Sequence, residues 1–131
     1  MKVVLYAQSM KGAGGELCRA IEESVVGKNH EVCKTTESLS QRLLHPNGDL
    51  TVAVLLAGNR EELDELVSIC ESLYDIRVIL ILPDRDEDTI SQGHKLFPRF
   101  ITYVDADLEM VGVVLSKMLI ESMPREGRTA G

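Results

Sequence analysis

The 131-residue sequence predicts an α/β protein: a three-layer α/β/α sandwich built around a five-stranded parallel sheet. Two observations support this prediction. Strand-like and helix-like segments alternate five times with short links between them, which is the pattern of parallel strands joined by crossover helices. In addition, residues 50–57 and 77–82 are nearly continuous apolar runs, as expected for strands that are covered on both faces.

The first part of the chain contains two expected strands, each followed by a helix. Lys2–Ala7 (KVVLYA) is a short apolar run rich in β-branched residues, and Glu16–Val26 places apolar residues on one helical stripe. His30–Lys34 is a weaker strand whose polar residues suit the edge of a sheet. Thr35 or Thr36 is placed to cap a short second helix, which ends before a Pro-Asn-Gly turn.

The middle of the chain has the clearest signals. Leu50–Ala57 (LTVAVLLA) is the third expected strand. Asn59 is a good N-cap for the third helix, and Glu62 stands three residues later, where a capping box needs it. That helix then repeats apolar residues at i, i+3, i+4 and i+7 as far as Tyr74.

The last part of the chain completes the alternation. Arg77–Leu82 (RVILIL) is the fourth expected strand, and the acidic run at residues 84–88 opens a fourth helix. Phe100–Val104 (FITYV) is the fifth strand, and Leu108–Ser122 is the last helix.

A chain of five strands and five helices at this length fits the flavodoxin-like strand order 2-1-3-4-5. In that order the first, third and fourth strands are the most enclosed, and these are the most continuously apolar runs of the sequence. No linker or internal repeat divides the chain, so one domain is expected over residues 1–123. Residues 124–131 are small and polar and are expected to form a flexible tail.

The composition excludes several classes of protein. The net charge is −7, whereas a general nucleic-acid binder, or a protein that docks on anionic membranes, needs a basic face. No apolar run approaches the ~20 residues of a membrane span, and the N-terminus lacks the pattern of a cleaved signal peptide. The three cysteines show no CxxC spacing and are typical of reduced thiols. We therefore expect a cytoplasmic protein that binds neither nucleic acid nor membrane.

The stretch Leu82–Leu119 has the arrangement found in one signalling family. A buried strand leads into an acidic loop, and a helix ends before a short strand that holds Tyr103. An Asp-Leu-Glu sequence at residues 107–109 then opens the last amphipathic helix. In this arrangement, and in the order of its elements over about the full length, the chain resembles the response-regulator receiver domains.

The resemblance implies where phosphoryl transfer would take place. Receivers hold Mg²⁺ with two acids after the first strand and accept the phosphoryl group on an Asp at the end of the third. A Thr or Ser ends the fourth strand, and a Lys ends the fifth. The cation and the Lys neutralise the charge that develops on the phosphoryl group.

The matching positions of this sequence carry other residues. The first strand ends in YAQS (6–9) without an acid, and the third in LLAGN (55–59) without an Asp. The fourth ends in LPD (82–84) without a Thr or Ser, and the fifth in VDA (104–106) without a Lys. We therefore predict a degenerate pseudo-receiver: a non-catalytic module for signalling or protein interaction that is not phosphorylated by the usual Asp mechanism.

The loop after the first strand is a candidate ligand-binding site, formed by Ser9, Lys11, Gly12, Gly14 and Gly15. In doubly wound folds anions meet free amides and a helix N-terminus here, and glycines let the backbone approach a phosphate. The loop matches neither a Walker A motif nor GxGxxG. Either it is a flexible connection, or the protein is a small-ligand protein or enzyme that binds a phosphate group or another anion here.

Acidic residues are expected at the carboxyl edge of the sheet: Asp84, Asp86, Glu87, Asp88, Asp105 and Asp107. Carboxylates bind hard cations, but Asp at a helix start is also an ordinary N-cap. We interpret these residues as caps and solvated charges and predict neither a metal site nor a cofactor. Cys18 lies one turn into the first helix, where a thiol pKa would be lowered, but no His is near it in sequence to act as a base.

The last helix has more apolar residues than its core contact needs. The expected core stripe is Leu108, Val111, Leu115, Met118 and Leu119, and the residues on other faces are Met110, Val113, Val114 and Ile120. Excess apolar residues on a surface helix indicate a partner surface, unless the tail or the first helix covers them. In receivers the fourth helix, fifth strand and fifth helix often form the dimer face. We therefore predict that these four residues bind a protein partner or a second copy of the chain, as in a homodimer.

Overall fold

The computed structural model describes residues 2–9, 11–24, 30–43, 50–73 and 76–122. The predicted tail at residues 124–131 lies outside this part of the chain and stays a prediction. Within the described residues, none of the helices has the length and apolar character needed to cross a membrane.

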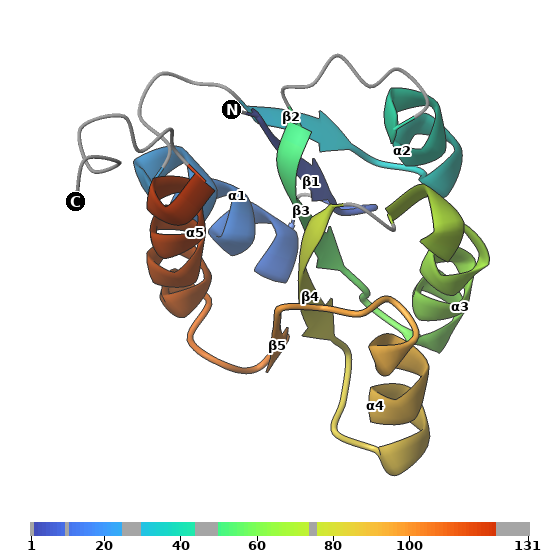
Figure 1. Ribbon diagram of the computed structural model, residues 1–131. Coiled ribbons are helices and arrows are strands. Elements are labelled where there is room, and N and C mark those ends of the chain that lie inside the picture. The colour runs from blue at the N-terminus through green and yellow to red at the C-terminus, as the bar shows by residue number, and fades with distance from the viewer. Residues whose placement is uncertain (1, 10, 25–29, 44–49, 74–75, 123–131) are drawn as a thin grey trace.

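A five-stranded parallel sheet runs through the centre of the molecule (Figure 1). The strands are β1 Lys2–Tyr6, β2 His30–Cys33, β3 Leu50–Leu56, β4 Arg77–Leu82 and β5 Phe100–Tyr103. Their spatial order is β2-β1-β3-β4-β5, and every neighbouring pair is parallel. This confirms the predicted flavodoxin-like order and places the weak second strand at an edge.

Helices cover both faces of the sheet. They are α1 Ala13–Ser24, α2 Thr36–Leu43, α3 Arg60–Ser68, the 3₁₀ turn η1 Cys70–Leu73, α4 Glu87–His94 and α5 Glu109–Ser122. Helices α1 and α5 lie side by side on one face, and α2, α3 and α4 cover the other (Figure 1). The two helical layers and the sheet between them form the predicted three-layer sandwich.

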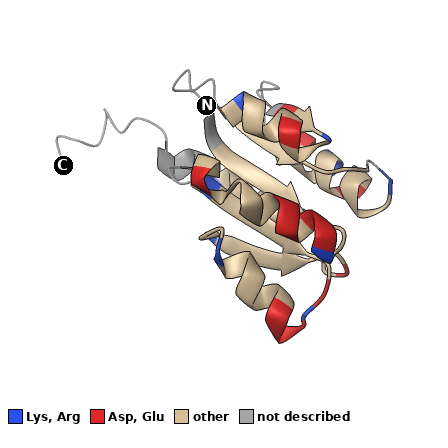
Figure 2. Ribbon diagram, turned by 90° about the vertical axis from the view of Figure 1, so that its right-hand side faces the viewer, with Lys and Arg blue, Asp and Glu red and all other residues tan. Residues whose placement is uncertain are grey.

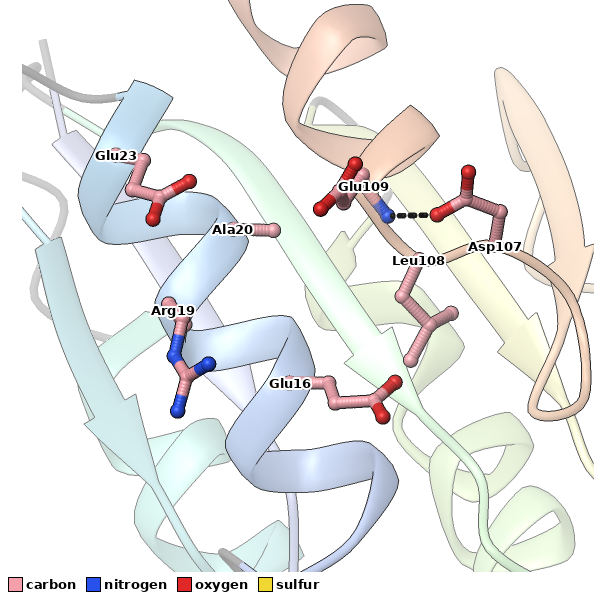
Figure 3. Close-up of a pocket in the computed structure, with 7 residues that line it drawn as sticks. All are labelled: Glu16, Arg19, Ala20, Glu23, Asp107, Leu108 and Glu109. Carbon is pink, nitrogen blue, oxygen red and sulfur yellow. Dashed lines mark hydrogen bonds between the residues drawn. The ribbon is translucent and has the colours of Figure 1, made fainter.

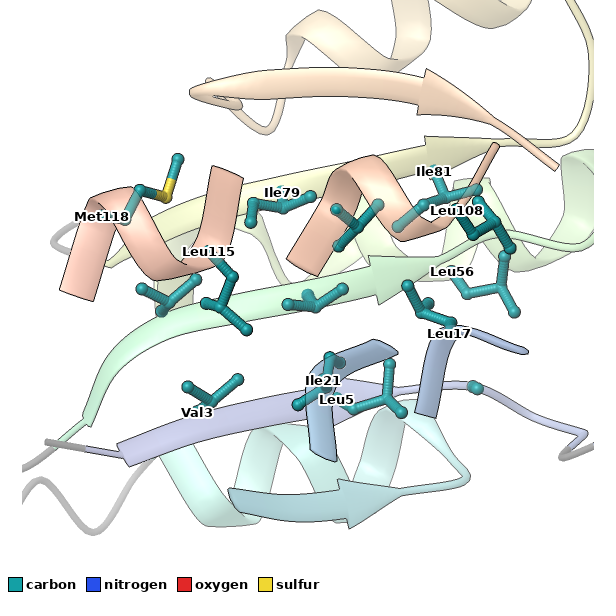
Figure 4. Close-up of a cluster of buried hydrophobic side chains, with 14 residues drawn as sticks. Val3, Leu5, Leu17, Ile21, Leu56, Ile79, Ile81, Leu108, Leu115 and Met118 are labelled. Atoms are coloured by element: carbon teal, nitrogen blue, oxygen red, sulfur yellow. The ribbon is translucent and has the colours of Figure 1, made fainter. Parts of the chain in front are cut away.

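The sheet separates two hydrophobic cores because successive residues of a strand point to opposite faces. In β3, Val52 and Val54 pack in the core under α1 and α5, whereas Ala53 and Leu55 pack in the core on the other side. Figure 4 shows the first core, where helix residues such as Leu115 meet the strands. This double cover explains why the central strands are continuous apolar runs.

Helix α1 begins at Ala13, three residues before the predicted start at Glu16. Gly14 and Gly15 are poor helix formers, so the sequence pattern placed the start too late. In the structure Gly14 is buried, and a Cβ atom there would lie 1.9 Å from the carbonyl oxygen of Ser9. Glycine is needed for this close approach, so the contact with the preceding loop fixes the first turn of the helix.

Helix α3 begins with the predicted capping interaction. The Glu62 amide donates to Asn59 Oδ1 at 2.8 Å, and the Glu62 carboxylate accepts from the Gly58 amide at 2.9 Å. The α-helix stops before η1, whereas the sequence predicts one continuous helix as far as Tyr74, which lies outside the described residues. The tighter turn still directs Leu73 into the core, where it is buried.

Candidate functional site

The carboxyl ends of the parallel strands meet at one edge of the sheet, where a receiver would hold its phosphoryl-transfer groups. After β1, the Gln8 side-chain amide donates to the Tyr6 hydroxyl at 2.7 Å, and burial raises the pKa of that hydroxyl. After β3, Gly58 and Asn59 take part in the cap of α3. Neither strand therefore ends in an acidic residue, and the Glu62 carboxylate beside Gly58 belongs to the cap of α3.

The loop between β4 and α4 places Asp84 in a chain of hydrogen bonds. The buried Thr89 side chain and the Asp86 amide, the latter at 3.0 Å, hydrogen-bond to the Asp84 carboxylate and lower its pKa. At the start of α3, Arg60 Nη1 donates to Thr89 Oγ1 at 3.3 Å, and its positive charge also lowers the Asp84 pKa. Asp84 is thus an ionised carboxylate that the protein's own groups stabilise.

Asp105 follows β5, where a receiver carries its Lys, and it forms an ion pair. Arg85 Nη1 lies 2.8 Å from Asp105 Oδ2, and this hydrogen bond lowers the Asp105 pKa and raises that of Arg85. The guanidinium also lies 4.3 Å from the centroid of the Tyr103 ring. Because both charges are exposed, the pair fixes the loop geometry more than it stabilises the fold.

The other members of the acidic group are dispersed. Asp107 Oδ1 accepts from the Glu109 amide at 3.0 Å just before α5, whereas Asp86 precedes α4 without a side-chain cap bond. Glu87 and Asp88 are exposed in the first turn of α4. In the part of the chain that the structure describes, no three His, Cys, Asp or Glu side chains are grouped so that they could hold a metal ion.

The glycine-rich loop is closed by its own hydrogen bonds. The Lys11 amide donates to Ser9 Oγ at 3.2 Å. The Gly14 amide donates to the Lys11 carbonyl at 3.2 Å, and the Glu16 amide donates to the Gly12 carbonyl at 3.1 Å. These three amides are therefore not available to an anion, and the Ser9 carbonyl oxygen, itself an acceptor, lies against Gly14. The loop geometry thus gives the phosphate-site hypothesis no support.

The thiols offer no activated nucleophile. Burial, together with the neighbouring Glu22 carboxylate, raises the pKa of Cys18, and burial also raises the pKa of Cys33. This is the opposite of the lowered pKa that a thiol near a helix N-terminus can have, because burial and a neighbouring carboxylate both disfavour the thiolate. Cys18, Cys33 and Cys70 form no disulfide.

The residues singled out on α5 separate into three groups. Met110 and Val113 are exposed large apolar side chains, with exposed fractions of 49% and 54%. Val114, in contrast, is half-buried and packs against the core under α1 and α5, so its expected position on an outer face is corrected. The side chain of Ile120 lies outside the described residues, and its role stays a prediction.

A groove lies between α1 and α5 (Figure 3). It consists of two adjoining hollows of about 380 and 390 Å³ that share Ala20, Glu23 and Glu109. The full lining is Glu16, Arg19, Ala20, Glu23, Asp107, Leu108, Glu109, Gly112, Val113 and Ser116. We call this feature the α1–α5 groove. Small residues such as Ala20 and Gly112 contribute to its lining, and four of the lining residues carry carboxylates.

Comparison with known proteins places the fold. No protein-family model matches the sequence, and no curated protein matches it. Solved structures do match: a response regulator from Thermotoga maritima superposes with a TM-score of 0.62 at 15% identity, covering 92% of this chain and 98% of that one. A LuxR family DNA-binding response regulator from Silicibacter pomeroyi gives 0.63 at 18% identity, covering 96% and 99%. The chain therefore has the flavodoxin-like fold of these response regulators over nearly its whole length.

Sequence reasoning found the exposed residues of α5 but missed the groove beside them. Ala20 and Gly112 are spaced far apart in the chain, and nothing in a single sequence pairs them. One signal was present: Gly112 interrupts an otherwise apolar helix, and a glycine there often marks a close approach. Likewise, the hydrogen bond between Arg60 and Thr89 joins two helices that only the fold brings together.

Proposed function

We propose that this chain is a receiver-like signalling module that acts by binding protein surfaces and not by accepting a phosphoryl group. Two lines support the proposal. The fold is that of response regulators, and the strand ends that would carry phosphoryl-transfer groups carry other side chains. A cytoplasmic location fits three cysteines that form no disulfide.

The loss of phosphoryl chemistry follows from the groups at the carboxyl edge. A phosphoryl acceptor needs a carboxylate after β3, but this position belongs to the sequence Ala57-Gly58-Asn59. The nearby carboxylate of Asp84 is engaged by Thr89 and by the charge of Arg60. A cation in this position opposes the binding of Mg²⁺, which a receiver needs to neutralise the transferred group.

The exposed apolar face of α5 is the observation that carries the interaction hypothesis. Met110 and Val113 are each about half exposed on neighbouring turns of one helix. Burying the exposed half of each side chain contributes about 1 kcal/mol, so the pair would contribute about 2 kcal/mol to binding before association costs. A partner or a second copy of the chain that covers this face gains that free energy.

Charge substitution on α5 tests the proposal. The double variant Met110→Lys and Val113→Lys should stay folded, because both side chains are on the surface, and should weaken binding at least 10-fold. Val32→Lys is the matched control, since Val32 is an exposed apolar residue on the edge strand β2. Sedimentation velocity follows self-association, and affinity capture from the native cytosol follows a partner. Equal binding by the double variant, the control and the parent chain would contradict the assignment.

A phosphodonor experiment tests the second half of the proposal. The protein is incubated with Mg²⁺ and a small-molecule phosphodonor, and its intact mass is then measured. We expect no phosphorylated species. A Mg²⁺-dependent phosphorylated product that hydroxylamine removes would show an aspartyl phosphate and overturn the proposal.

A further inference from the structure

The turn between α4 and β5 presents an aromatic side chain to solvent in an unusual conformation. Phe97 has an exposed fraction of 80%, and its φ angle is +51°. Bulky residues rarely adopt positive φ angles, and glycine is the ordinary choice there. A phenylalanine that is both conformationally strained and exposed is a candidate for a functional contact.

Hydrogen bonds on both sides hold this turn in place. The Phe97 amide donates to the His94 carbonyl at 3.0 Å, and the Arg99 amide donates to the Val78 carbonyl at 2.8 Å. Leu96, the residue before Phe97, is anchored in the core with an exposed fraction of 2%. The aromatic ring therefore projects from a fixed backbone, which lowers the entropy cost of placing it in a partner.

Basic side chains flank the aromatic ring. Lys95 and Arg99 are exposed, and neither makes an ion pair within the described residues. Figure 2 shows that opposite charges lie at the two ends of α4. Acidic residues lie at its start, and basic residues lie where the chain turns toward β5. We call Lys95, Phe97 and Arg99 the Phe97 knob. Aromatic and arginine side chains are the residue types that dominate binding energy at protein interfaces.

The α1–α5 groove has complementary properties. The carboxylates of Glu16, Glu23, Asp107 and Glu109 line it, together with Arg19. Its lining also includes the small residues Ala20 and Gly112 and the apolar Val113. Figure 3 shows Ala20 between Glu16 and Glu23 on α1. Glu16, Glu23 and Glu109 make no ion pair within the described residues. The groove therefore combines small and apolar residues with a lining rich in carboxylates.

We propose that the Phe97 knob of one copy of this chain docks in the α1–α5 groove of a second copy. The ring packs against Ala20, Gly112 and Val113, and Lys95 and Arg99 approach the carboxylates of the lining. The knob follows α4 in one helical layer, whereas the groove lies in the opposite layer, so a chain does not fill its own groove (Figure 1). The contact is head-to-tail, so a pair of copies leaves one knob and one groove open.

This inference goes beyond the proposed function because it assigns a second surface and names its occupant. The knob is remote from Met110, and the groove includes Val113 as part of its wall. A symmetric contact through α5 closes at the dimer, whereas a head-to-tail contact continues to larger species as the concentration rises. The two modes are therefore distinguishable by size alone.

A charge exchange tests the contact. Lys95→Glu with Arg99→Glu makes the knob acidic, and Glu23→Lys with Glu109→Lys makes the groove lining net basic. We expect each double variant to remain monomeric when it is alone, from about 10 μM to 1 mM, because knob and groove then repel. A mixture of the two variants, and the quadruple variant, should associate again. Sedimentation velocity measures each sample.

Phe97→Gly removes the aromatic ring without destabilising the fold, so it tests the contribution of the ring to self-association. Glycine suits the positive φ angle, so the melting temperature should stay the same or rise, while self-association weakens about 10-fold or more. Met110→Lys tests the α5 face in parallel. If Met110→Lys abolishes association and neither the charge exchange nor Phe97→Gly changes it, the α5 proposal stands and the knob-in-groove contact is wrong. If none of these variants changes the association of the parent chain, or if the parent chain stays monomeric, the knob-in-groove contact is also wrong.

Discussion

Replacing Gly14 by alanine tests the closed conformation of the glycine-rich loop. The added Cβ atom would stand 1.9 Å from the Ser9 carbonyl oxygen and 3.0 Å from its carbonyl carbon. Carbon–oxygen contacts below 3.0 Å do not occur for real Cβ atoms, so the helix and the loop must separate by about 1.1 Å. The obstacle is backbone on both sides, and no side-chain rotation relieves it.

The expected cost follows from this overlap. Overpacking costs about 1–3 kcal/mol, and a 1.9 Å contact with backbone belongs to the upper part of that range, about 2–3 kcal/mol. The higher helix propensity of alanine returns about 1 kcal/mol. The net loss is about 1–2 kcal/mol in the free energy of unfolding, which lowers the melting temperature by about 4–8 °C for a domain of this length. Urea and thermal unfolding measure both quantities.

Gly58→Ala is the matched control. A Cβ atom at Gly58 meets only the Glu62 carboxylate, at 3.3 Å, and the end of this side chain needs to give by only a few tenths of an ångström, which its 2.9 Å hydrogen bond to the Gly58 amide can absorb. The control should change stability by no more than about 0.5 kcal/mol. If Gly14→Ala is as stable as the parent chain, the Ser9 carbonyl does not lie against Gly14 in solution, and the close approach of loop and helix is wrong.

Three further predictions concern single interactions. Asn59→Ala removes the cap bond of α3 and should cost about 1 kcal/mol in urea unfolding, whereas Asp86→Ala at the start of α4 removes no cap bond and should cost much less. Because Arg85 lowers the Asp105 pKa, the ion pair stabilises the fold above the unfolded pKa of Asp and is lost as the pH falls through the lower folded value. Arg85→Gln should therefore raise the Asp105 titration midpoint measured by carboxyl NMR. Since the Cys18 pKa is raised, its thiol should react with a disulfide reagent at pH 8 more slowly than free cysteine.

Each of these three predictions has an outcome that contradicts it. Equal losses for Asn59→Ala and Asp86→Ala would mean that the side-chain cap does not stabilise α3. An unchanged Asp105 midpoint in Arg85→Gln would mean that the pair is not formed in solution. A Cys18 that reacts faster than free cysteine would restore the activated thiol and reopen a catalytic function.

The strands and most helices were predictable because local pattern and tertiary environment agree. The runs around Val54 and Leu80 are apolar at every position, and the structure buries both faces of these strands. The capping residues Asn59 and Glu62 act within one turn of helix, so their three-residue spacing was enough to predict the cap hydrogen bond. Where an interaction is local, the sequence was sufficient to predict it.

The failures occur where contacts outside a single helix or strand decide the structure. Gly14 is helical because the loop before it requires a residue without a side chain, and helix propensity alone places the start of α1 later. Val114 lies toward the core because α5 packs beside α1, which a helical wheel of α5 cannot show. The positive φ angle of Phe97 had no signal in the sequence, since the position lacks the glycine that normally marks such a turn.

The candidate surface was therefore only partly predictable. The outer face of an amphipathic surface helix is normally polar. Met110 and Val113 were found because they are apolar residues on that face. The α1–α5 groove was not found, because its walls come from the two ends of the chain. Its acidic character arises from residues such as Glu16 and Glu109, each of which is ordinary in the first turn of a helix.

The most direct test of the central claim is a set of ¹H–¹⁵N spectra of the labelled protein, recorded on dilution and then with Mg²⁺ and a small phosphodonor. An interaction module without a phosphoryl switch should show concentration-dependent shifts or broadening on α5, centred on Met110 and Val113, and no response to Mg²⁺ and the phosphodonor. A spectrum that does not change on dilution, together with saturable shifts at the carboxyl edge around Gln8, Asn59 and Asp84, would contradict the account and indicate a working receiver site.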